Sequence, residues 1–307
     1  MPRTELRFKR FDVVYKTVDG IPFDASALVP TTVIDSLRPA RPVLVHFHGG
    51  AFIMGTALDR ELTPLWLLQF AESRGAIVIS PCYRLLPEAT GTDILDDIKD
   101  FWDWLYRRLG SAVSEKWTGV SIDLGRIAVA GEGAGGTLAL QSGLLWPQVG
   151  IKVVMVHSGA LDPDSTAFNP RQAQACEDED RFVTEYLKGI KRGTFRVSSP
   201  FPEHLELVQA AINTGRIREL LGNDEWMHIR SNLRKAKAVP AIWITQGADD
   251  SFTPKQCANG LVDEIRVAHP NTPLLYSLQP GVHAFEIKQE LTEAWLQEGL
   301  RFVEQYW

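Results

Sequence analysis

Residues 126–145 are the segment that most restricts the possible folds of this chain. Residues 126–130 form a short apolar run with β-branched side chains, which is typical of a buried strand. Residues 131–136 read Gly-Glu-Gly-Ala-Gly-Gly, and the apolar stretch 137–145 predicts a helix packed on a core. A strand that turns tightly into a helix is the repeating unit of α/β proteins, so this segment predicts an α/β fold.

The rest of the chain continues the alternation of strands and helices. Strands are predicted at 8–18, 21–29, 43–47, 76–79, 151–156, 241–245 and 274–278, and helices at 92–108, 255–267 and 286–305. These elements predict one α/β domain over 1–307, with a mostly parallel eight-stranded sheet and flanking helices. The polar stretch 163–235 breaks the rhythm, and we expect it to form a helical cap together with residues 1–40.

Composition excludes several classes of function. The chain has 307 residues, a net charge of −6 and 45% hydrophobic residues, which suits a full core and argues against nucleic-acid binding. No apolar run approaches the length of a membrane span, and the first residues do not resemble a signal peptide. Three cysteines are too few for a disulfide framework, and no histidine or cysteine spacing is typical of a metal site. We therefore expect a cytoplasmic protein without a metal.

The glycine-rich turn also fits a dinucleotide-binding pattern, G-x-G-x-x-G, through Gly131, Gly133 and Gly136. That pattern needs an acidic residue about 20 positions further on to bind a ribose hydroxyl. Residues 151–158 contain none, and Asp162 comes late. The turn also follows several earlier strands, whereas the fingerprint usually lies in the first strand–helix unit. The dinucleotide reading is therefore the weaker one.

Three separate motifs carry a family resemblance. Residues 48–52 read His-Gly-Gly-Ala-Phe directly after a strand, residues 83–88 read Tyr-Arg-Leu-Leu-Pro-Glu, and residues 131–136 form the glycine-rich turn. In this combination the chain resembles the hormone-sensitive-lipase-like branch of the α/β-hydrolases, which includes many carboxylesterases. The resemblance runs from about residue 10 to the end. The turn matches the G-x-S-x-G nucleophile elbow of these enzymes, with Gly133 where they have serine.

The resemblance implies most of a catalytic site around the missing nucleophile. Backbone N–H groups of Gly49, Gly50 and Ala134 would form an oxyanion hole, which stabilises negative charge on a substrate oxygen. Glycine at position 133 would keep the strained turn without steric cost while it removes the hydroxyl. The family assigns the segment 83–88 a structural role, so we place no catalysis on Arg84 or Glu88.

The candidate acid and base come late in the chain, in the family order. The stretch 247–254 fits the hydrolase pattern G-x-x-D-x-x-x-P, which selects Asp250, with Asp249 as the alternative. His283 lies in the loop before the last helix, where the family has its catalytic histidine. Asp250 would orient the imidazole, and His283 would take a proton from a substrate or a water. We expect a ring nitrogen of His283 to face Gly133.

Four readings of the missing serine remain open at this point. The first is an enzyme repurposed for elimination, cyclisation or condensation of a carbonyl compound. The second is a carboxylesterase-like hydrolase, which either uses water activated by histidine or has had a native serine replaced deliberately by the present Gly133. The third is a ligand-binding receptor, and the fourth is a non-catalytic scaffold. Retention of His283 and Asp250 favours the first two readings over the others, because a pure binder gains little from a base and its orienting acid, and of these two we take the repurposed enzyme as the main hypothesis.

The expected ligand is a medium-sized, mostly apolar small molecule with a carbonyl or ester group, for example a polyketide or another secondary metabolite. Phe52 and Phe285 directly follow the oxyanion loop and the candidate histidine, and with Trp226 and Phe252 they are the candidate substrate-binding residues. No motif implies a cofactor. Members of this branch often dimerise, so a homodimer is an expectation of the resemblance alone.

Overall fold

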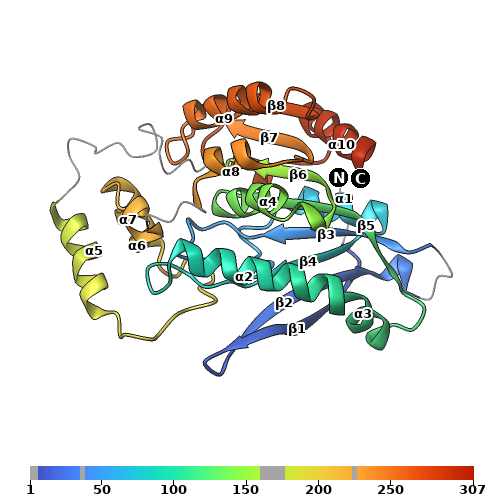
Figure 1. Ribbon diagram of the computed structural model, residues 1–307, viewed down its shortest axis with the longest axis horizontal. Coiled ribbons are helices and arrows are strands. Elements are labelled where there is room, and N and C mark those ends of the chain that lie inside the picture. Colours follow the sequence, from blue (N-terminus) through green and yellow to red (C-terminus); the bar gives the residue numbers. More distant parts are fainter. Residues whose placement is uncertain (1–5, 35–38, 160–176, 223–226) are drawn as a thin grey trace.

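The computed structural model describes residues 6–34, 39–159, 177–222 and 227–307 (Figure 1). In this part of the chain, eight strands form one sheet in the order β1-β2-β4-β3-β5-β6-β7-β8. β1 and β2 are antiparallel to their neighbours, and all later pairings are parallel. The strands are β1 Phe8–Val18, β2 Ile21–Pro30, β3 Arg41–Phe47, β4 Ile77–Pro81, β5 Ile122–Glu132, β6 Ile151–His157, β7 Ala241–Gly247 and β8 Leu274–Gln279. The predicted mostly parallel, eight-stranded sheet is confirmed.

Helices cover both faces of this sheet (Figure 1). The longer ones are α1 Leu65–Arg74, α2 Gly91–Trp104, α3 Gly110–Lys116, α4 Ala134–Leu145, α5 Glu177–Gly189, α6 Leu205–Asn213, α7 Ile217–Leu221, α8 Ile229–Lys235, α9 Lys255–Ala268 and α10 Ala294–Tyr306. Single turns are η1 Thr31–Val33, η2 Leu105–Leu109, η3 Pro147–Val149 and η5 Phe285–Lys288. This three-layer arrangement is the one predicted for alternating strands and helices.

Two hydrophobic clusters lie on opposite faces of the sheet because side chains alternate along each strand. On β3, Val43 and Val45 join the cluster under α2, α4 and α9, whereas Leu44 joins the cluster under α1 and α10. All seven residues of β3 are buried. The central strands therefore show no polar face, as expected for parallel strands covered on both sides.

The structure differs from the sequence prediction at three places. Residues 8–30 are the two outer strands of the sheet and are not part of a cap. The predicted helix 92–108 changes to a single wide turn at Leu105–Leu109 before α3 continues it. The last helix begins at Ala294 instead of 286, because residues 285–288 form the separate turn η5, which buries Glu286.

The predicted cap over 163–235 is only partly described. Residues 163–176 and 223–226 lie outside the described residues. Figure 1 shows α5, α6 and α7 beyond the carboxyl ends of the parallel strands, where α/β proteins bind their ligands. By contrast, α8 packs against α4 and α9 in the body of the domain.

Candidate active site

The tight turn between β5 and α4 has the backbone of a nucleophile elbow. Gly133 has φ 53° and ψ −117°, a backbone conformation that residues other than glycine adopt only under strain. The turn passes so close to β3 that a Cβ on Gly135 would lie 1.9 Å from the carbonyl oxygen of Phe47. Gly133 N–H donates to the carbonyl of His157 at 2.9 Å, which fixes the turn to β6. The local geometry therefore survives without a serine.

The open side of Gly133 faces His283. A Cβ added at Gly133 would have two neighbours within 4 Å, His283 Nε2 at 3.4 Å and Cε1 at 3.7 Å. Among the described residues other than its two chain neighbours, every other atom is further away, so the imidazole borders the position a nucleophile would occupy. The sequence-based expectation that a ring nitrogen of His283 faces Gly133 agrees with this arrangement.

Asp250 holds the other side of the imidazole. His283 Nδ1–H donates to Asp250 Oδ2 at 2.9 Å, whereas exposed Asp249 donates its N–H to the carbonyl of Gly281. Of the two carboxyls left open by the sequence, the structure thus pairs Asp250 with the histidine. This bond fixes the tautomer, with the proton on Nδ1 and a lone pair on Nε2 toward Gly133.

The Asp250 carboxylate is buried but well supplied with donors. The N–H groups of Phe252 and Thr253 donate to Oδ1 at 2.9 and 2.8 Å, and Gln246 donates to Oδ2 at 3.1 Å. Burial alone would raise the pKa of Asp250, but the hydrogen bond and charge of His283, with the Thr253 donors, keep it below its usual value. Asp250 therefore stays ionised beside the imidazole.

The electrostatics at His283 favour proton uptake. Burial alone would lower its pKa, but the hydrogen bond and charge of Asp250, and the charge of Glu286, raise the pKa above its ordinary value. About a quarter of the side chain, 28%, is exposed, so the ring edge remains accessible. A histidine in this setting can act as a general base near neutral pH.

The loop after β3 supplies free backbone donors. Gly50 has φ 98°, and its carbonyl accepts the N–H groups of Ile53 and Met54 at 3.0 Å. Within the described part of the chain, the N–H groups of Gly49, Gly50 and Ala134 take part in none of the turn or loop hydrogen bonds. They are thus available to a ligand oxygen, as an oxyanion hole requires.

His48 orders this loop and does not act as a base. Its Nδ1–H donates to the carbonyl of Gly49 at 2.8 Å, and its ring stacks on Tyr83 with centroids 4.3 Å apart. The Tyr83 hydroxyl donates to the carbonyl of His48 at 2.8 Å. Burial lowers the pKa of His48 to about 4, so the ring is neutral at physiological pH. A Cβ on Gly55 would lie 2.2 Å from Nδ1, so glycine is required there.

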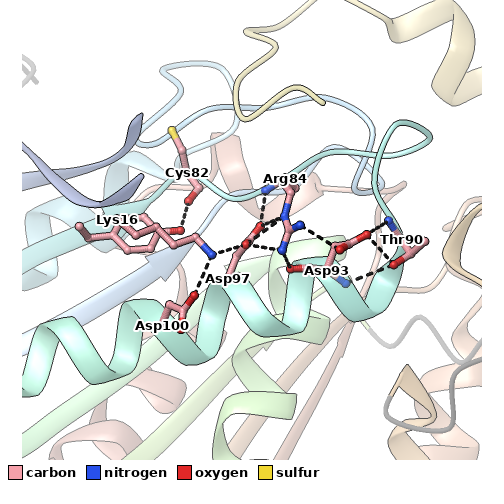
Figure 2. A network of polar contacts seen from close by, with 8 residues as sticks. Lys16, Cys82, Arg84, Thr90, Asp93, Asp97 and Asp100 are labelled. Atoms are coloured by element: carbon pink, nitrogen blue, oxygen red, sulfur yellow. Dashed lines mark hydrogen bonds and ion pairs between the residues drawn. The ribbon is translucent and has the colours of Figure 1, made fainter. Parts of the chain in front are cut away.

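The segment 83–88 has the structural role that the resemblance implied. Figure 2 shows Arg84 between Asp97 and Asp93 of α2, with Lys16 of β1 on the other side of Asp97. Arg84 donates to Asp97 at 2.8–3.0 Å and to Asp93 at 2.9 Å, and Lys16 also pairs with Asp97, which is fully buried. This network joins the loop after β4 to α2 and to β1.

The segment 196–199, part of the predicted cap, is joined directly to the loop after β3. Gly55 and Ser199 exchange two backbone hydrogen bonds of 2.6 and 2.9 Å. Arg196, in the same cap segment, donates to both carboxylate oxygens of Glu88 at 2.9 and 2.7 Å and to the carbonyl of Ile53 at 3.0 Å. The cap segment therefore helps to fix the loop that carries Gly49 and Gly50.

Sequence reasoning missed a group of buried polar side chains behind the elbow. His46 Nε2–H donates to Glu132 Oε2 at 2.7 Å, and His157 Nδ1 shares a hydrogen bond with the Thr245 hydroxyl at 2.8 Å. Burial first, and the charge of His46 second, lower the pKa of His157 to about 3. The available signal was that four polar residues lie at or near the ends of otherwise apolar strands, but their pairing across strands is a tertiary property.

The predicted substrate-binding residues are dispersed. The Phe252 ring lies 5.3 Å from the His283 ring, so it borders the site. Phe52 is fully buried in the core, and Phe285 packs on Trp295 with ring centroids 5.5 Å apart. Trp226 lies outside the described residues. Phe252 is therefore the aromatic side chain that the structure places beside the imidazole.

The fold and this geometry can now be compared with known proteins. A family model described as alpha/beta hydrolase fold matches residues 44–253, more than half of the chain. The chain belongs to this α/β-hydrolase family. Within the described residues of this hydrolase, no helix is long and apolar enough to cross a bilayer, and no cluster of three or more ligating side chains is suited to a metal ion.

Curated relatives of this hydrolase include fungal proteins. It is 34% identical over 311 residues to a probable carboxylesterase, M8, of Phoma sp., an alignment that covers 98% of this chain and 97% of that protein. It is also 28% identical over 184 residues to the non-reducing polyketide synthase Preu6 of Preussia isomera, covering 59% of this chain and 8% of the synthase. Among solved structures, a fungal esterase of Rhizomucor miehei aligns with a TM-score of 0.64, 17% identity, and coverage of 98% and 84% of the two chains. At this identity the last comparison supports the fold alone.

Proposed function

We propose that this hydrolase-fold protein is an enzyme that catalyses a non-hydrolytic reaction of a carbonyl compound, with His283 as general base. The observation that carries the proposal is the retained His283–Asp250 pair, whose Nε2 borders the position of a missing nucleophile. An acyl-enzyme cannot form at Gly133, because glycine has no nucleophilic atom in its side chain. The chemistry must therefore begin with proton transfer to His283 from a substrate or a water.

In the proposed reaction His283 Nε2 takes a proton from a carbon next to a carbonyl group. The electron pair of that C–H bond moves onto the carbonyl oxygen, and the N–H groups of Gly49, Gly50 and Ala134 stabilise the resulting enolate. The enolate then expels a group from the next carbon, or attacks a second carbonyl within the same molecule or another one. The imidazolium returns its proton to the oxygen that leaves or forms.

The substrate class follows from the site and from the relatives. Phe252 borders the imidazole, so the site offers an apolar ring beside the base. A part of a polyketide synthase is among the curated relatives, and polyketides contain the repeated carbonyl groups that such chemistry needs. We therefore propose a mostly apolar, polyketide-like carbonyl compound as the substrate.

Exchange of hydrogen for deuterium tests the proton transfer without knowledge of the product. Candidate polycarbonyl compounds are incubated with the protein in heavy water, and label at the carbon next to the carbonyl is followed by mass spectrometry. We expect exchange faster than in heavy water alone with the native chain, and no acceleration over that background with His283→Ala. Tight binding of such a compound without exchange or turnover would instead identify a receptor.

A carboxylesterase is the second candidate, favoured by the similarity to the probable carboxylesterase of Phoma sp. over nearly the whole chain. In this case His283 would activate a water that occupies the space beside Gly133, and the water would attack the ester carbonyl directly. Ester hydrolysis that depends on His283, together with no deuterium exchange in any carbonyl compound, would select this candidate over the first.

A further inference from the structure

Glu286 is a buried carboxyl that the proposed reaction does not yet use. It lies in the turn η5, three residues after His283, and its side chain is fully buried. Its Oε2 accepts the Ser158 hydroxyl at 2.9 Å, and its backbone carbonyl accepts Trp66 Nε1–H at 3.0 Å. Its Oε1 has no hydrogen-bond partner among the described residues. The carboxyl is thus held in place but incompletely satisfied.

The charges around Glu286 come from several elements. His283 lies on the same loop and is connected to Glu286 through Ser158, whose carbonyl accepts the Thr253 hydroxyl at 2.9 Å, and that hydroxyl lies 3.3 Å from His283 Nδ1. The charge of Glu132 at the end of β5, which is bound by His46 of β3, also acts on Glu286. Ser158 and Trp66 contribute neutral donors from the end of β6 and from α1. No lysine or arginine forms an ion pair with Glu286 in the described part of the chain. The protonated imidazole of His283 is therefore the cation that can compensate its charge.

We propose that Glu286 is a positioning residue for His283, whose buried carboxylate stabilises the imidazolium form through space while Asp250 does so through a hydrogen bond. The inference deepens the proposed function and rests on it, because the imidazolium matters only if His283 takes up a proton. In the absence of a serine, the base removes that proton directly from a weakly acidic substrate or water. A second carboxylate strengthens the base for this more demanding step.

The ionisation of Glu286 supports this role. Burial, and to a lesser degree repulsion by Glu132, raise the pKa of Glu286 to about 7. Its backbone hydrogen bond, the charge of His283 and the Ser158 hydroxyl act in the opposite direction but do not cancel this increase. The carboxyl therefore changes charge in the pH range in which a histidine also titrates, and the two groups form a coupled pair. As pH rises and Glu286 ionises, His283 becomes the stronger base.

The titration of His283 measures the effect directly. The full-length protein with isotope-labelled histidine is followed by NMR from acidic to alkaline pH, and the His283 signal is assigned by its loss in His283→Ala. We expect Glu286→Gln to lower the His283 midpoint by about one pH unit or more, because a nearby opposite charge shifts a pKa by about 1–3 units. The matched control Glu290→Gln changes an exposed glutamate four residues later and should leave the midpoint in place.

A second variant covers the case in which Glu286→Gln does not fold. Ser158→Ala keeps the carboxyl but removes a donor from its Oε2, so Glu286 ionises less readily and the His283 midpoint should fall by a smaller amount. An unchanged His283 midpoint in either folded variant would overturn the proposal.

The readout separates this inference from the proposed function because the titration needs no substrate. A shifted midpoint in a protein that shows no His283-dependent exchange supports the electrostatic coupling and refutes the proposed reaction. His283-dependent exchange with a midpoint that Glu286→Gln does not move refutes the role of Glu286 alone. If both proposals hold, the pH at which exchange is half-maximal should shift in Glu286→Gln and Ser158→Ala in the same direction as the His283 midpoint measured by NMR.

Discussion

Replacing Gly133 with serine would place a hydroxyl beside a base that is already oriented. The Cβ would lie 3.4 Å from His283 Nε2, so an oxygen one bond further on can reach hydrogen-bond distance, about 2.6–3.2 Å. Asp250 and the backbone donors need not move. Loss of the serine from a catalytic triad lowers turnover by about 10⁶-fold, which sets the upper limit for the gain in ester hydrolysis that Gly133→Ser can produce.

The change also has an energetic cost that can be estimated from the backbone. The φ of 53° at Gly133 lies in a region where other residues are strained by about 1–3 kcal/mol. Gly133→Ala is the matched control, because it introduces the same strain and a methyl group at the same place but no nucleophile. Both variants should unfold several degrees below the native chain, since each kcal/mol lowers the melting temperature of a domain this size by about 2–4 °C.

The assay is hydrolysis of a short-chain aryl ester, with mass spectrometry after treatment with a fluorophosphonate to detect a covalent adduct. We expect Gly133→Ser to gain several orders of magnitude in turnover and to form the adduct, and Gly133→Ala to do neither. If Gly133→Ser folds but hydrolyses no faster than Gly133→Ala, then the acid, base and oxyanion donors are not aligned for catalysis. That result would refute the reading of this site as hydrolase machinery without its nucleophile.

Three further outcomes follow from the same structure. Asp250→Asn should reduce His283-dependent exchange by about 10⁴-fold, because it disturbs the tautomer of the imidazole, whereas Asp249→Asn should leave the rate near native; equal losses would contradict the pairing. Asp97→Asn should lower the free energy of unfolding by about 3 kcal/mol, because it removes the buried anion that Lys16 and Arg84 share. A much smaller loss in urea denaturation would show that the network in Figure 2 contributes little. Burial lowers the pKa of His48 to about 4 and of His157 to about 3, so the folded state binds fewer protons than the unfolded state at mildly acidic pH. The free energy of unfolding should therefore fall by about 2 kcal/mol per histidine as the pH is lowered from about 7 to about 5. His157→Phe should make this pH dependence weaker, as measured by urea denaturation at several pH values.

Local chemistry made much of the site predictable from sequence. The turn at 131–136 could be located because only glycine tolerates its close approach to β3, a requirement visible as a run of glycines. The order of an acidic residue after a late strand and a histidine before the last helix led to Asp250 and His283. The choice between Asp250 and Asp249 needed the structure, because adjacent residues at a strand end point in different directions.

Features that depend on packing between distant segments could not be predicted. The sequence 286–305 looks like one helix, but burial of Glu286 against Ser158 separates η5 from α10. Phe52 follows the oxyanion loop in sequence, yet its backbone direction sends the ring into the core. Similarly, the sequence predicts strands within residues 8–30 but does not predict which edge of the sheet they join. Only the pairing of β2 with β4 assigns them to the sheet.

The backbone at Gly133 has a consequence for how such a site changes over generations. At the positive φ of this position glycine is unstrained and serine is strained, so a mutation from serine to glycine stabilises the fold at the same time as it removes the nucleophile. The exchange requires a single base change between a GGY and an AGY codon. Selection for hydrolysis and selection for stability therefore act in opposite directions at this position. A lineage that no longer requires an acyl-enzyme has a thermodynamic reason to retain glycine, while hydrolysis stays one mutation away.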